Sequence, residues 1–283
     1  MRVLGVIAEY NPFHRGHAYH LMKARRAAQA DYVVAVMSTC FTQRGDAAML
    51  SPGDRARMAL ACGADAVFAL PAVWAVRDAE HFALGGVALL DGMGVDAISF
   101  GAEEDDLSRL TASARLLENP DVALQDALHQ GLERGMPYPA AMAAAAEASE
   151  PGAGAVLSAP NNQLAVCYLR AMTRVGSRME AYPIKRTADY HATGLTQEMP
   201  SATALRGAVE RGDWQGVRAA MPVKACDILR EAALSGRILS KGALDQALMY
   251  RLRTMTEDEF HALPDVSEGI EDRLRAASLD SRA

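Results

Sequence analysis

Two histidines flank an Arg-Gly pair, His14-Arg15-Gly16-His17, soon after the first apolar run of the chain. Imidazole N–H groups can donate hydrogen bonds to phosphate oxygens, and a glycine lets the backbone come close to a nucleotide. Such a pair could stabilise charge on an α-phosphate during displacement without forming a covalent intermediate. An H-x-G-H pattern arises by chance in roughly 1% of sequences of this composition. The alternative is that both histidines only cap a helix.

A second candidate lies late in the chain, Ser201-Ala202-Thr203-Ala204-Leu205-Arg206. Ser201 could cap a helix there, while backbone amides and the hydroxyls of Ser201 and Thr203 hold the β- and γ-phosphates of a nucleotide. Taken alone, the segment is a plain helix N-terminus; together with the histidine pair it predicts a triphosphate site.

Further polar residues follow predicted strands or precede helices. Arg44 follows the second strand and is a candidate for holding a small carboxylate or a phosphate. Lys185 and Arg186 offer two cations to a triphosphate, with a solvated loop edge as the alternative. Gly101 ends the fourth strand, so its backbone could approach adenine or ribose.

Asn161 and Asn162 precede a helix and could bind the nucleotide, although each could equally be a helix cap. Glu9 and Asp46 are weak candidates for Mg²⁺ ligation through water. His20, His81, His129, His191 and His261 lack metal-ligand spacing, so no protein metal site is predicted, although His191 is near the triphosphate segment.

The first hundred residues, which contain the histidine pair, alternate between short apolar strands and helices. Strands are predicted over residues 3–8, 32–37, 66–70 and 95–100, and helices over 16–29, 51–62 and 78–90. Without hairpin signals, the pattern predicts a doubly wound, Rossmann-like parallel sheet. The histidine pair then lies at the carboxyl end of the first strand, where phosphates meet helix N-termini.

After residue 101 the pattern becomes helical, with predicted helices over 105–117, 121–134, 139–149 and 161–174. Residues 150–155 are interpreted as a loop, and 179–184 as a returning strand. We therefore expect a nucleotide-binding domain over 1–205 with a helical insertion at about 105–155. A helical C-terminal domain is expected over 206–283.

Net charge, cysteine content and the length of the apolar stretches limit the classes of function that are possible. A net charge of −6 excludes a protein that coats nucleic acid non-specifically, but a local basic patch could dock one structured RNA. Two candidates are the helical stripe Arg170, Arg174 and Arg178, and the cluster Lys23, Arg25 and Arg26; a solvated helix face is the alternative for both. Four scattered cysteines and the lack of a long apolar stretch predict a cytoplasmic protein without a membrane span.

The segments GVIAEYNPFHRGHAYHL, DYVVAVMS, FTQRG, ADAVFALP, FGAE, PNN, and KR before YHA occur in this order over nearly the whole chain. The sequence thereby resembles the tRNA(Met) cytidine acetate ligases, within the H-x-G-H nucleotidyltransferase superfamily that includes class I aminoacyl-tRNA synthetases. The resemblance implies adenylation of acetate by ATP and transfer of the acetyl group to N4 of the wobble cytidine of elongator tRNA(Met). Mg²⁺ is expected with the ATP.

The resemblance places ATP contacts on Gly101, on Asn161 or Asn162, on Arg186, and on the loop from Ile7 to His20. The loop residues named for this role are Ile7, Ala8, Glu9, Tyr10, Asn11, Pro12, Phe13, His14, Gly16, His17 and His20.

Two features depart from that family. Thr39-Cys40 stands where its members usually have Gly-Asn, and the usual C-terminal segment rich in Lys and Arg is not found. From Ser201 to Ala283 there are 12 Lys or Arg and 13 Asp or Glu, so composition provides no basic substitute there. The chain is then either a shortened form with impaired tRNA binding or a natural paralogue. A paralogue could activate another small acid or phosphate, or bind nucleotide without catalysis.

Overall fold

The computed structural model describes residues 1–186, 201–264, 266 and 269–280. By packing, the chain forms two compact units, Met1–Ile238 and Leu239–Ala283. His191, which the sequence placed near the triphosphate segment, lies outside the described residues.

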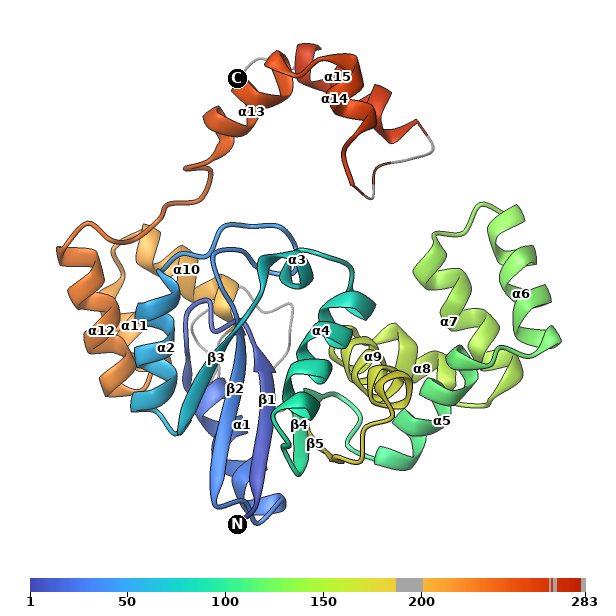
Figure 1. Ribbon diagram of the computed structural model, residues 1–283, viewed down its shortest axis with the longest axis horizontal. Coiled ribbons are helices and arrows are strands. Elements are labelled where there is room, and N and C mark those ends of the chain that lie inside the picture. The colour runs from blue at the N-terminus through green and yellow to red at the C-terminus, as the bar shows by residue number, and fades with distance from the viewer. Residues whose placement is uncertain (187–200, 265, 267–268, 281–283) are drawn as a thin grey trace. The chain divides into compact units, whose positions relative to one another are not determined.

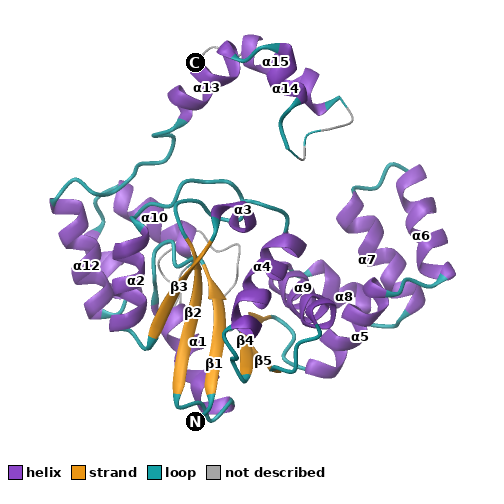
Figure 2. Ribbon diagram, in the orientation of Figure 1, coloured by secondary structure: helices purple, strands orange, loops and turns teal. Residues whose placement is uncertain are grey.

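The centre of the first unit is one five-stranded parallel sheet in the order β3-β2-β1-β4-β5 (Figures 1 and 2). Its strands are β1 (Val3–Ala8), β2 (Tyr32–Ser38), β3 (Ala66–Leu70), β4 (Ala97–Ala102) and β5 (Glu180–Lys185). The chain runs outward from β1 to β2 and β3 and then returns to the other side of β1 with β4. The point between β1 and β4 is therefore the topological switch point, where such sheets bind ligands at the carboxyl edge.

Both faces of the sheet are covered, which confirms the doubly wound, Rossmann-like prediction. Side chains alternate along a strand, so Leu4 and Val6 of β1 pack into one core cluster while Ile7 packs against the other. The first cluster is covered by α1 (Arg15–Ala27), α2 (Pro52–Ala61), α10 (Ala202–Glu210), α11 (Trp214–Ala220) and α12 (Val223–Leu234). The second is covered chiefly by α4 (Ala79–Gly92) and α9 (Pro160–Val175).

Four helices lie between β4 and α9. They are α5 (Leu107–Glu118), α6 (Val122–Glu133), α7 (Tyr138–Ser149) and α8 (Ala153–Ser158). Figure 1 shows α6 and α7 side by side, farther from the sheet than α9. The loop interpretation of 150–155 was wrong at its end, because α8 begins at Ala153 after Gly152, which has φ of 90°. The short helix α3 (Ala72–Ala75) was also missed.

The first unit extends beyond the domain boundary expected at 205/206. Residue 205 lies inside α10, and Leu205, Val217 and Leu229 of α10, α11 and α12 are all buried in the first core cluster. These helices therefore pack on the nucleotide-binding sheet, and the packing divides the chain after Ile238. The second unit contains α13 (Asp245–Thr254), α14 (Glu257–His261) and α15 (Ile270–Asp280).

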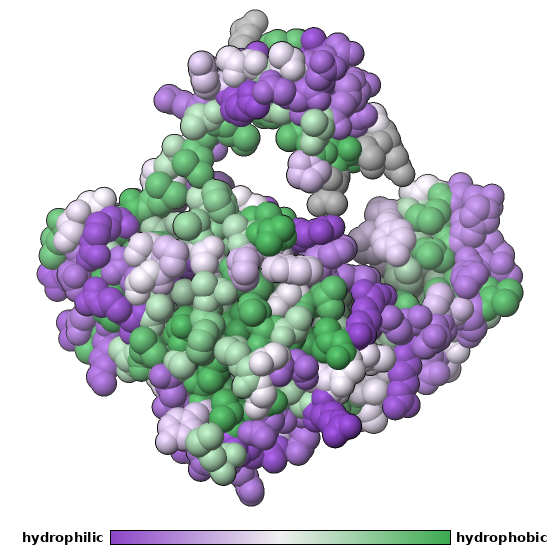
Figure 3. Space-filling view, viewed as in Figure 1, coloured by the Kyte–Doolittle hydropathy of each residue, from purple (hydrophilic) through white to green (hydrophobic). Residues whose placement is uncertain are grey.

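One face of the first unit carries exposed apolar residues. Figure 3 shows green residues gathering over β3 and α3, and the exposed large ones there include Phe68, Val73 and Val76. β3 is an edge strand, so this apolar surface borders the open edge of the sheet. No helix in the described part of the chain has the length and apolar character needed to cross a membrane.

Candidate functional site

The H-x-G-H segment forms the N-terminal cap of α1 at the carboxyl end of β1. His14 is the N-cap residue, and its Nδ1 accepts a hydrogen bond from the Gly16 N–H at 3.0 Å. His17 returns the interaction, because its Nδ1 accepts from the His14 N–H at 3.2 Å. A Cβ at Gly16 would lie 2.8 Å from Cε1 of His14, so this cap requires glycine there. The two rings stack with centroids 3.7 Å apart.

Burial keeps both imidazoles neutral. Burial first, and then the charge of Arg186, lowers the pKa of His14 to about 3. The pKa of His17 is also held well below its usual value, first by burial and then by its neighbours His14, Arg186 and His20. A neutral ring whose Nδ1 accepts a hydrogen bond carries its proton on Nε2. Each ring therefore caps the helix with one nitrogen and retains an N–H donor on the other.

A third histidine, His20, contacts β4, and hydrogen bonds there determine which of its ring nitrogens carries the proton. The Ser99 hydroxyl donates its only proton to the Tyr182 carbonyl at 2.8 Å, so it must accept from Nε2–H of His20 at 3.1 Å. Burial and the charge of Arg186 lower the pKa of His20 to about 4. Neutral His20 is therefore protonated on Nε2 and presents Nδ1 as an acceptor. Ser99 was missed from the sequence, because a lone serine in a buried strand carries no motif.

Arg186 is the cation shared by these three histidines. Its backbone N–H donates to the Ala102 carbonyl at 2.8 Å, which anchors it beyond the carboxyl ends of β4 and β5. A Cβ at Gly101 would lie 3.3 Å from Cγ of Arg186, so the glycine leaves room for the arginine stem. The structure thus brings Gly101 and Arg186 together beside the histidine cluster, at the switch point of the sheet.

Most of the remaining loop residues predicted to contact ATP point their side chains into the protein. Tyr10, Asn11, Pro12 and Phe13 are buried, and the Asn11 side chain accepts from the Met49 N–H at 2.9 Å. Tyr10 has φ of 48°, in the left-handed region, and the Asn11–Pro12 peptide bond is cis. A nucleotide could meet these residues mainly through their backbone.

The strand residues before the loop are Ile7 and Ala8, and both are half-buried. The Ile7 side chain packs on α4, since a Cβ at Gly86 would lie 2.6 Å from its Cδ1. Its side chain therefore belongs to the second core cluster rather than to a ligand surface.

Glu9 follows β1 and is surrounded by cations. Its Oε1 accepts from the Gln43 N–H at 2.6 Å. Burial raises the pKa of Glu9, and the Gln43 N–H and the charges of Arg55, Arg44 and Arg206 oppose that rise. Arg55 was missed from the sequence, because it lies within the amphipathic pattern of α2; it is fully buried, and its Nη1 donates to the Glu9 carbonyl.

Arg44 lies in a turn at the carboxyl end of β2, as expected, and its side chain is exposed. The turn is closed by hydrogen bonds from the Thr42 N–H to the Asp46 carbonyl and from the Gly45 N–H to the Thr42 carbonyl. Arg44 is close enough to Glu9 for its charge to act on that carboxylate. A role for Arg44 in holding an acid or phosphate stays a prediction.

The asparagine pair holds the loop after β4. Oδ1 of buried Asn162 accepts from the N–H groups of Glu103 and Glu104, both at 2.9 Å. The Glu103 carboxylate in turn accepts from the backbone N–H groups of Asn161 and Asn162 at the first turn of α9. Neither asparagine is the cap residue of α9, which is Ala159. These contacts position the Gly101 loop, and direct nucleotide contact by either asparagine stays a prediction.

Lys185 ends β5, and its ammonium group lies 3.2 Å from a carboxylate oxygen of Asp105. Both side chains are exposed, so the pair is open to solvent. Lys185 therefore faces the loop that precedes α5, and its role in holding a triphosphate stays a prediction.

The Ser201–Arg206 segment begins α10, as expected. Ser201 is the N-cap and accepts from the Ala204 N–H at 3.1 Å. Arg206 Nη1 donates to the Asn11 carbonyl at 2.9 Å, and its Nη2 lies 3.1 Å from Oγ1 of Thr203. This contact ties the start of α10 to the loop after β1, although the two segments are 195 positions apart.

The arginines of the predicted RNA-docking stripe form ion pairs within the protein or lie outside the helix. Arg170 and Arg174 form a network of ion pairs with Glu80 and Glu118, and Arg170 is only 12% exposed. Arg178 lies beyond the end of α9 at Val175. The predicted stripe was therefore wrong, because acids on α4 and α5 neutralise two members and the helix ends before the third.

In the second basic cluster, on α1, Arg25 and Lys23 also contact groups within the protein. Arg25 pairs with Asp65 and donates to two backbone carbonyls. Lys23 lies over the Tyr19 ring, with its Nζ 5.6 Å from the centroid.

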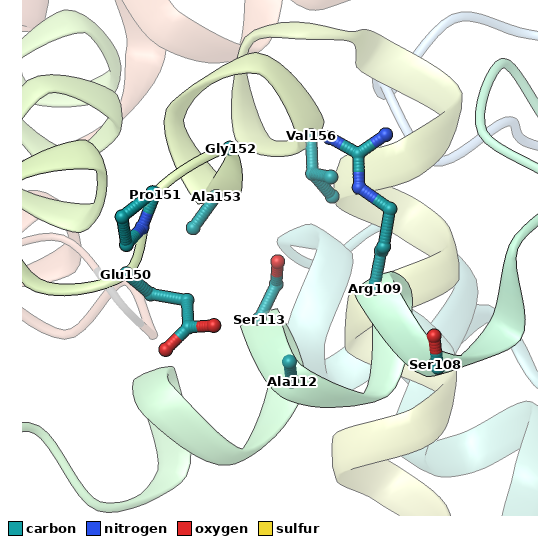
Figure 4. Close-up of a pocket in the computed structure, with 9 residues that line it drawn as sticks. All are labelled: Ser108, Arg109, Ala112, Ser113, Glu150, Pro151, Gly152, Ala153 and Val156. Carbon is teal, nitrogen blue, oxygen red and sulfur yellow. The ribbon is translucent and has the colours of Figure 1, made fainter.

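One pocket lies away from this site, between α5 and the start of α8 (Figure 4). Its volume is about 170 Å³, and Figure 4 shows Ser113 pointing from α5 toward the turn at Gly152. None of the sequence-predicted site residues lines it. Its lining is Ser108, Arg109, Ala112, Ser113, Glu150, Pro151, Gly152, Ala153 and Val156.

The profile of a family described as HIGH Nucleotidyl Transferase matches residues 1–283. The tRNA(Met) cytidine acetate ligase of Syntrophotalea carbinolica is 39% identical over 286 residues, covering 100% of this chain and 68% of that protein. The ligase of the same name from Acetivibrio thermocellus is 36% identical over 288 residues, covering 98% of this chain and 69% of that protein.

Two solved structures are similar over the whole chain. Thermotoga maritima TmcAL bound with alpha-thio ATP has a TM-score of 0.91, 34% identity and coverage of 100% of this chain and 68% of that one. The apo form of TmcAL has a TM-score of 0.93 at 34% identity, covering 100% and 69%. Because the family profile covers all residues and these relatives match nearly the full chain, the chain belongs to the HIGH nucleotidyl transferases, in the family of the tRNA(Met) cytidine acetate ligases.

Proposed function

We propose that this chain activates acetate with ATP as acetyl-adenylate and transfers the acetyl group to N4 of the wobble cytidine of elongator tRNA(Met). The activity for which its relatives are named and the ATP analogue bound to its structural neighbour support this proposal. The observation that carries it is the reciprocal cap of His14 and His17, which leaves two neutral imidazole N–H donors beside a helix N-terminus at the switch point.

In the first step an acetate oxygen forms a bond to the α-phosphorus, the bond to the β-phosphate oxygen breaks, and pyrophosphate leaves. The Nε2–H groups of His14 and His17 donate to α-phosphate oxygens as negative charge develops on them. Arg186 supplies a full positive charge beside the same rings. In the second step N4 of the cytidine attacks the acetyl carbon, the bond from that carbon to the phosphate oxygen breaks so that AMP leaves, and N4 loses one proton to solvent.

The rest of ATP would extend from the histidine cluster in two directions. The backbone at Gly101 would meet the adenosine, because the loop that follows is held against α9 by Asn162. The N-terminus of α10, with Ser201 and Thr203, would meet the β- and γ-phosphates, because Arg206 ties it to the loop after β1.

Mg²⁺ would enter with the nucleotide. No group of three or more His, Cys, Asp or Glu side chains that could hold a metal occurs in the described ranges. The chemistry of Mg²⁺ sites with substrate phosphates requires only one or two protein carboxylates. Glu9 fits such a role better than Asp46, because Glu9 lies directly after β1 and Asp46 is exposed in the turn after β2. Bound Mg²⁺ would neutralise phosphate charge.

Acetate-dependent exchange of labelled pyrophosphate into ATP tests the first step. We expect exchange by the wild type and a loss of about 100-fold or more in His17→Ala, because both a transition-state donor and the cap are removed. His129→Ala, at an exposed position on α6, is the matched control and should exchange normally. Absence of acetate-dependent exchange by the folded wild type would refute acetate activation.

A second candidate is adenylation of a different small acid or phosphate. The observation that favours it is Thr39-Cys40, which follows β2 at the carboxyl edge of the sheet, with Cys40 exposed. A panel of acceptors assayed for pyrophosphate release distinguishes the two. A preference for formate, propionate or a phosphate over acetate would support this second function.

Contact with tRNA rests on the relatives alone. Among the described residues the predicted basic stripe is neutralised, so the structure identifies no RNA surface in its place. We place the reaction in the cytoplasm, where the tRNA substrate is found and where the four free cysteines would stay reduced.

A further inference from the structure

Arg55 of α2 has the largest side chain among the fully buried residues of the described chain, with 0% exposure. A buried guanidinium is unfavourable unless its N–H groups find partners. Burial lowers the pKa of Arg55, and the charges of Glu9 and Cys40 oppose that change. Its Nη1 donates to the Glu9 carbonyl, which fixes the guanidinium beside the loop that follows β1.

Two other donors of Arg55, Nε and Nη2, are buried and meet no hydrogen-bond partner among the described residues. These two nitrogens present parallel N–H bonds along one edge of the guanidinium plane. That spacing matches the two oxygens of a carboxylate, which arginine binds in a bidentate manner. The large majority of buried side-chain polar atoms are paired in folded proteins, so two adjacent unpaired donors indicate a missing ligand.

Two buried hydroxyls at the same edge of the sheet are also without partners among the described residues. They belong to Tyr10, directly after Glu9, and to Ser38, the last residue of β2. β1 and β2 are paired up to Ala8 and Met37, so both hydroxyl-bearing residues follow that last pair. Hydroxyl groups can donate to a carboxylate, and both hydroxyls belong to residues at the carboxyl edge of β1 and β2.

The positive charges near Glu9 favour the binding of a second anion in this region. Three arginines, Arg55, Arg44 and Arg206, act on this single carboxylate. A second carboxylate would therefore enter a region whose charge is positive overall.

We propose that the Nε–Nη2 edge of Arg55 binds the carboxylate of the acid that is activated. This inference rests on the function proposed above and identifies the acid subsite within it. It moves the acid from exposed Arg44 to the buried guanidinium. The subsite and the phosphate site adjoin the same loop, because Arg55 donates to the Glu9 carbonyl and the ring of the next residue, Tyr10, has its centroid 4.9 Å from that of His17. Enclosure would also exclude water from the mixed anhydride.

The first test separates acid binding from ATP binding. In pyrophosphate exchange, we expect Arg55→Lys to raise the apparent KM for acetate about tenfold or more, because it keeps the charge but loses the bidentate pair. The KM for ATP should stay within about twofold, since the phosphate donors are untouched. Arg57→Gln is the matched control on the same helix, since Arg57 is exposed and pairs at the surface with Glu231.

The second test uses the wild type and does not depend on a variant that folds. Acetate is titrated in a carboxylate-free buffer, with a non-hydrolysable ATP analogue present, while the arginine Nε–H signals are followed by ¹H–¹⁵N NMR. We expect one protected signal, absent from Arg55→Lys, to shift downfield with saturation, and methylsulfonamide to leave it unchanged.

The outcomes separate the two proposals. A wild type that exchanges pyrophosphate with acetate, but whose Arg55 signal does not respond to it, overturns the subsite alone; the two N–H groups are then hydrated. The subsite is likewise overturned if Arg55→Lys leaves the KM for acetate unchanged. The wild type could instead show no pyrophosphate exchange while its Arg55 signal shifts with acetate. That result would refute acetate activation and would still support a carboxylate-binding site at Arg55.

Discussion

In His14 and His17, one ring nitrogen caps helix α1 and the other remains a hydrogen-bond donor for a ligand. Nδ1 of His14 accepts from the Gly16 N–H in the first turn of α1, and Nδ1 of His17 accepts from the N–H of the N-cap residue His14, so Nε2 of each ring must carry the proton. Helix capping and phosphate binding, which the sequence presented as alternatives, are therefore compatible in the same side chain. His20 differs, because Ser99 binds its Nε2–H and leaves Nδ1 as the acceptor.

The depressed pKa values of these histidines predict a pH-dependent stability. Each folded pKa lies below the usual value of 6.5, about 3 for His14 and about 4 for His20. Between those values and 6.5 the unfolded chain binds more protons, so the stability is fully present above pH 6.5 and is lost as pH falls. Each histidine contributes a slope of at most about 1.4 kcal/mol per pH unit.

Chemical denaturation of the wild type and His17→Asn from pH 8 to pH 4 measures this slope. Asparagine can accept the His14 N–H but does not titrate, so we expect a shallower decline in the variant below pH 6.5. Equal slopes in both proteins would contradict a buried neutral His17.

At the scale of elements, the N-terminus of α10 is joined to the loop after β1. The Arg206 contact with the Asn11 carbonyl places this helix start beside the loop that precedes α1, and Leu205 is buried in the first core cluster. A helix N-terminus at that position can bind phosphate through backbone amides only while its first turn is intact. The cap at Ser201 therefore affects both folding and the proposed triphosphate contact.

We expect Ser201→Ala to lower the free energy of unfolding by about 0.5–2 kcal/mol through loss of the cap. It should also reduce the stabilisation that ATP gives, because the hydroxyl and the ordered amides would no longer meet the phosphates. Asp213→Ala removes the N-cap of α11, whose Oδ1 accepts from the Gly216 N–H at 2.9 Å, and serves as the control. Thermal denaturation with and without ATP should show a lower Tm in both variants, but a smaller ATP shift only in Ser201→Ala. The same ATP shift in both variants would argue against phosphate binding at α10.

At the scale of the whole molecule, the candidate site belongs to one packing unit. All its described residues, from Ile7 to Arg206, lie in Met1–Ile238, and α10, α11 and α12 complete the first core cluster. An N-terminal fragment that ends at the expected boundary of 205 would remove the buried side chains of α11 and α12 from this core.

We therefore expect a fragment of residues 1–238 to fold and to keep the ATP-induced rise in Tm of the full chain. A fragment of residues 1–205 should unfold at markedly lower temperature, because it exposes the apolar surface that Val217 and Leu229 cover. Circular dichroism melts with and without ATP compare the two fragments. A stable 1–205 fragment with a full ATP response would place the boundary where the sequence suggested it.

Most helices and strands, and the position of the histidine pair after the first strand, could be predicted from local sequence patterns. The ranges predicted for β1 and β3 match the structure, and Pro52 begins α2 after a Ser51 cap. These features are local: apolar runs, cap residues and prolines act within a few positions of one another. The family resemblance was also present in the order of the motifs, and the comparisons confirmed it.

Which charged groups remain available for a ligand depends on contacts that form only in the folded protein. Arg170 and Arg174 look like an RNA stripe in sequence, but their partners Glu80 and Glu118 lie on two other helices. Arg55 looks like an ordinary helix residue, yet folding buries it against the Glu9 carbonyl, 46 positions away. Ion pairing and desolvation depend on neighbours brought together by packing, and spacing along the chain does not encode them directly.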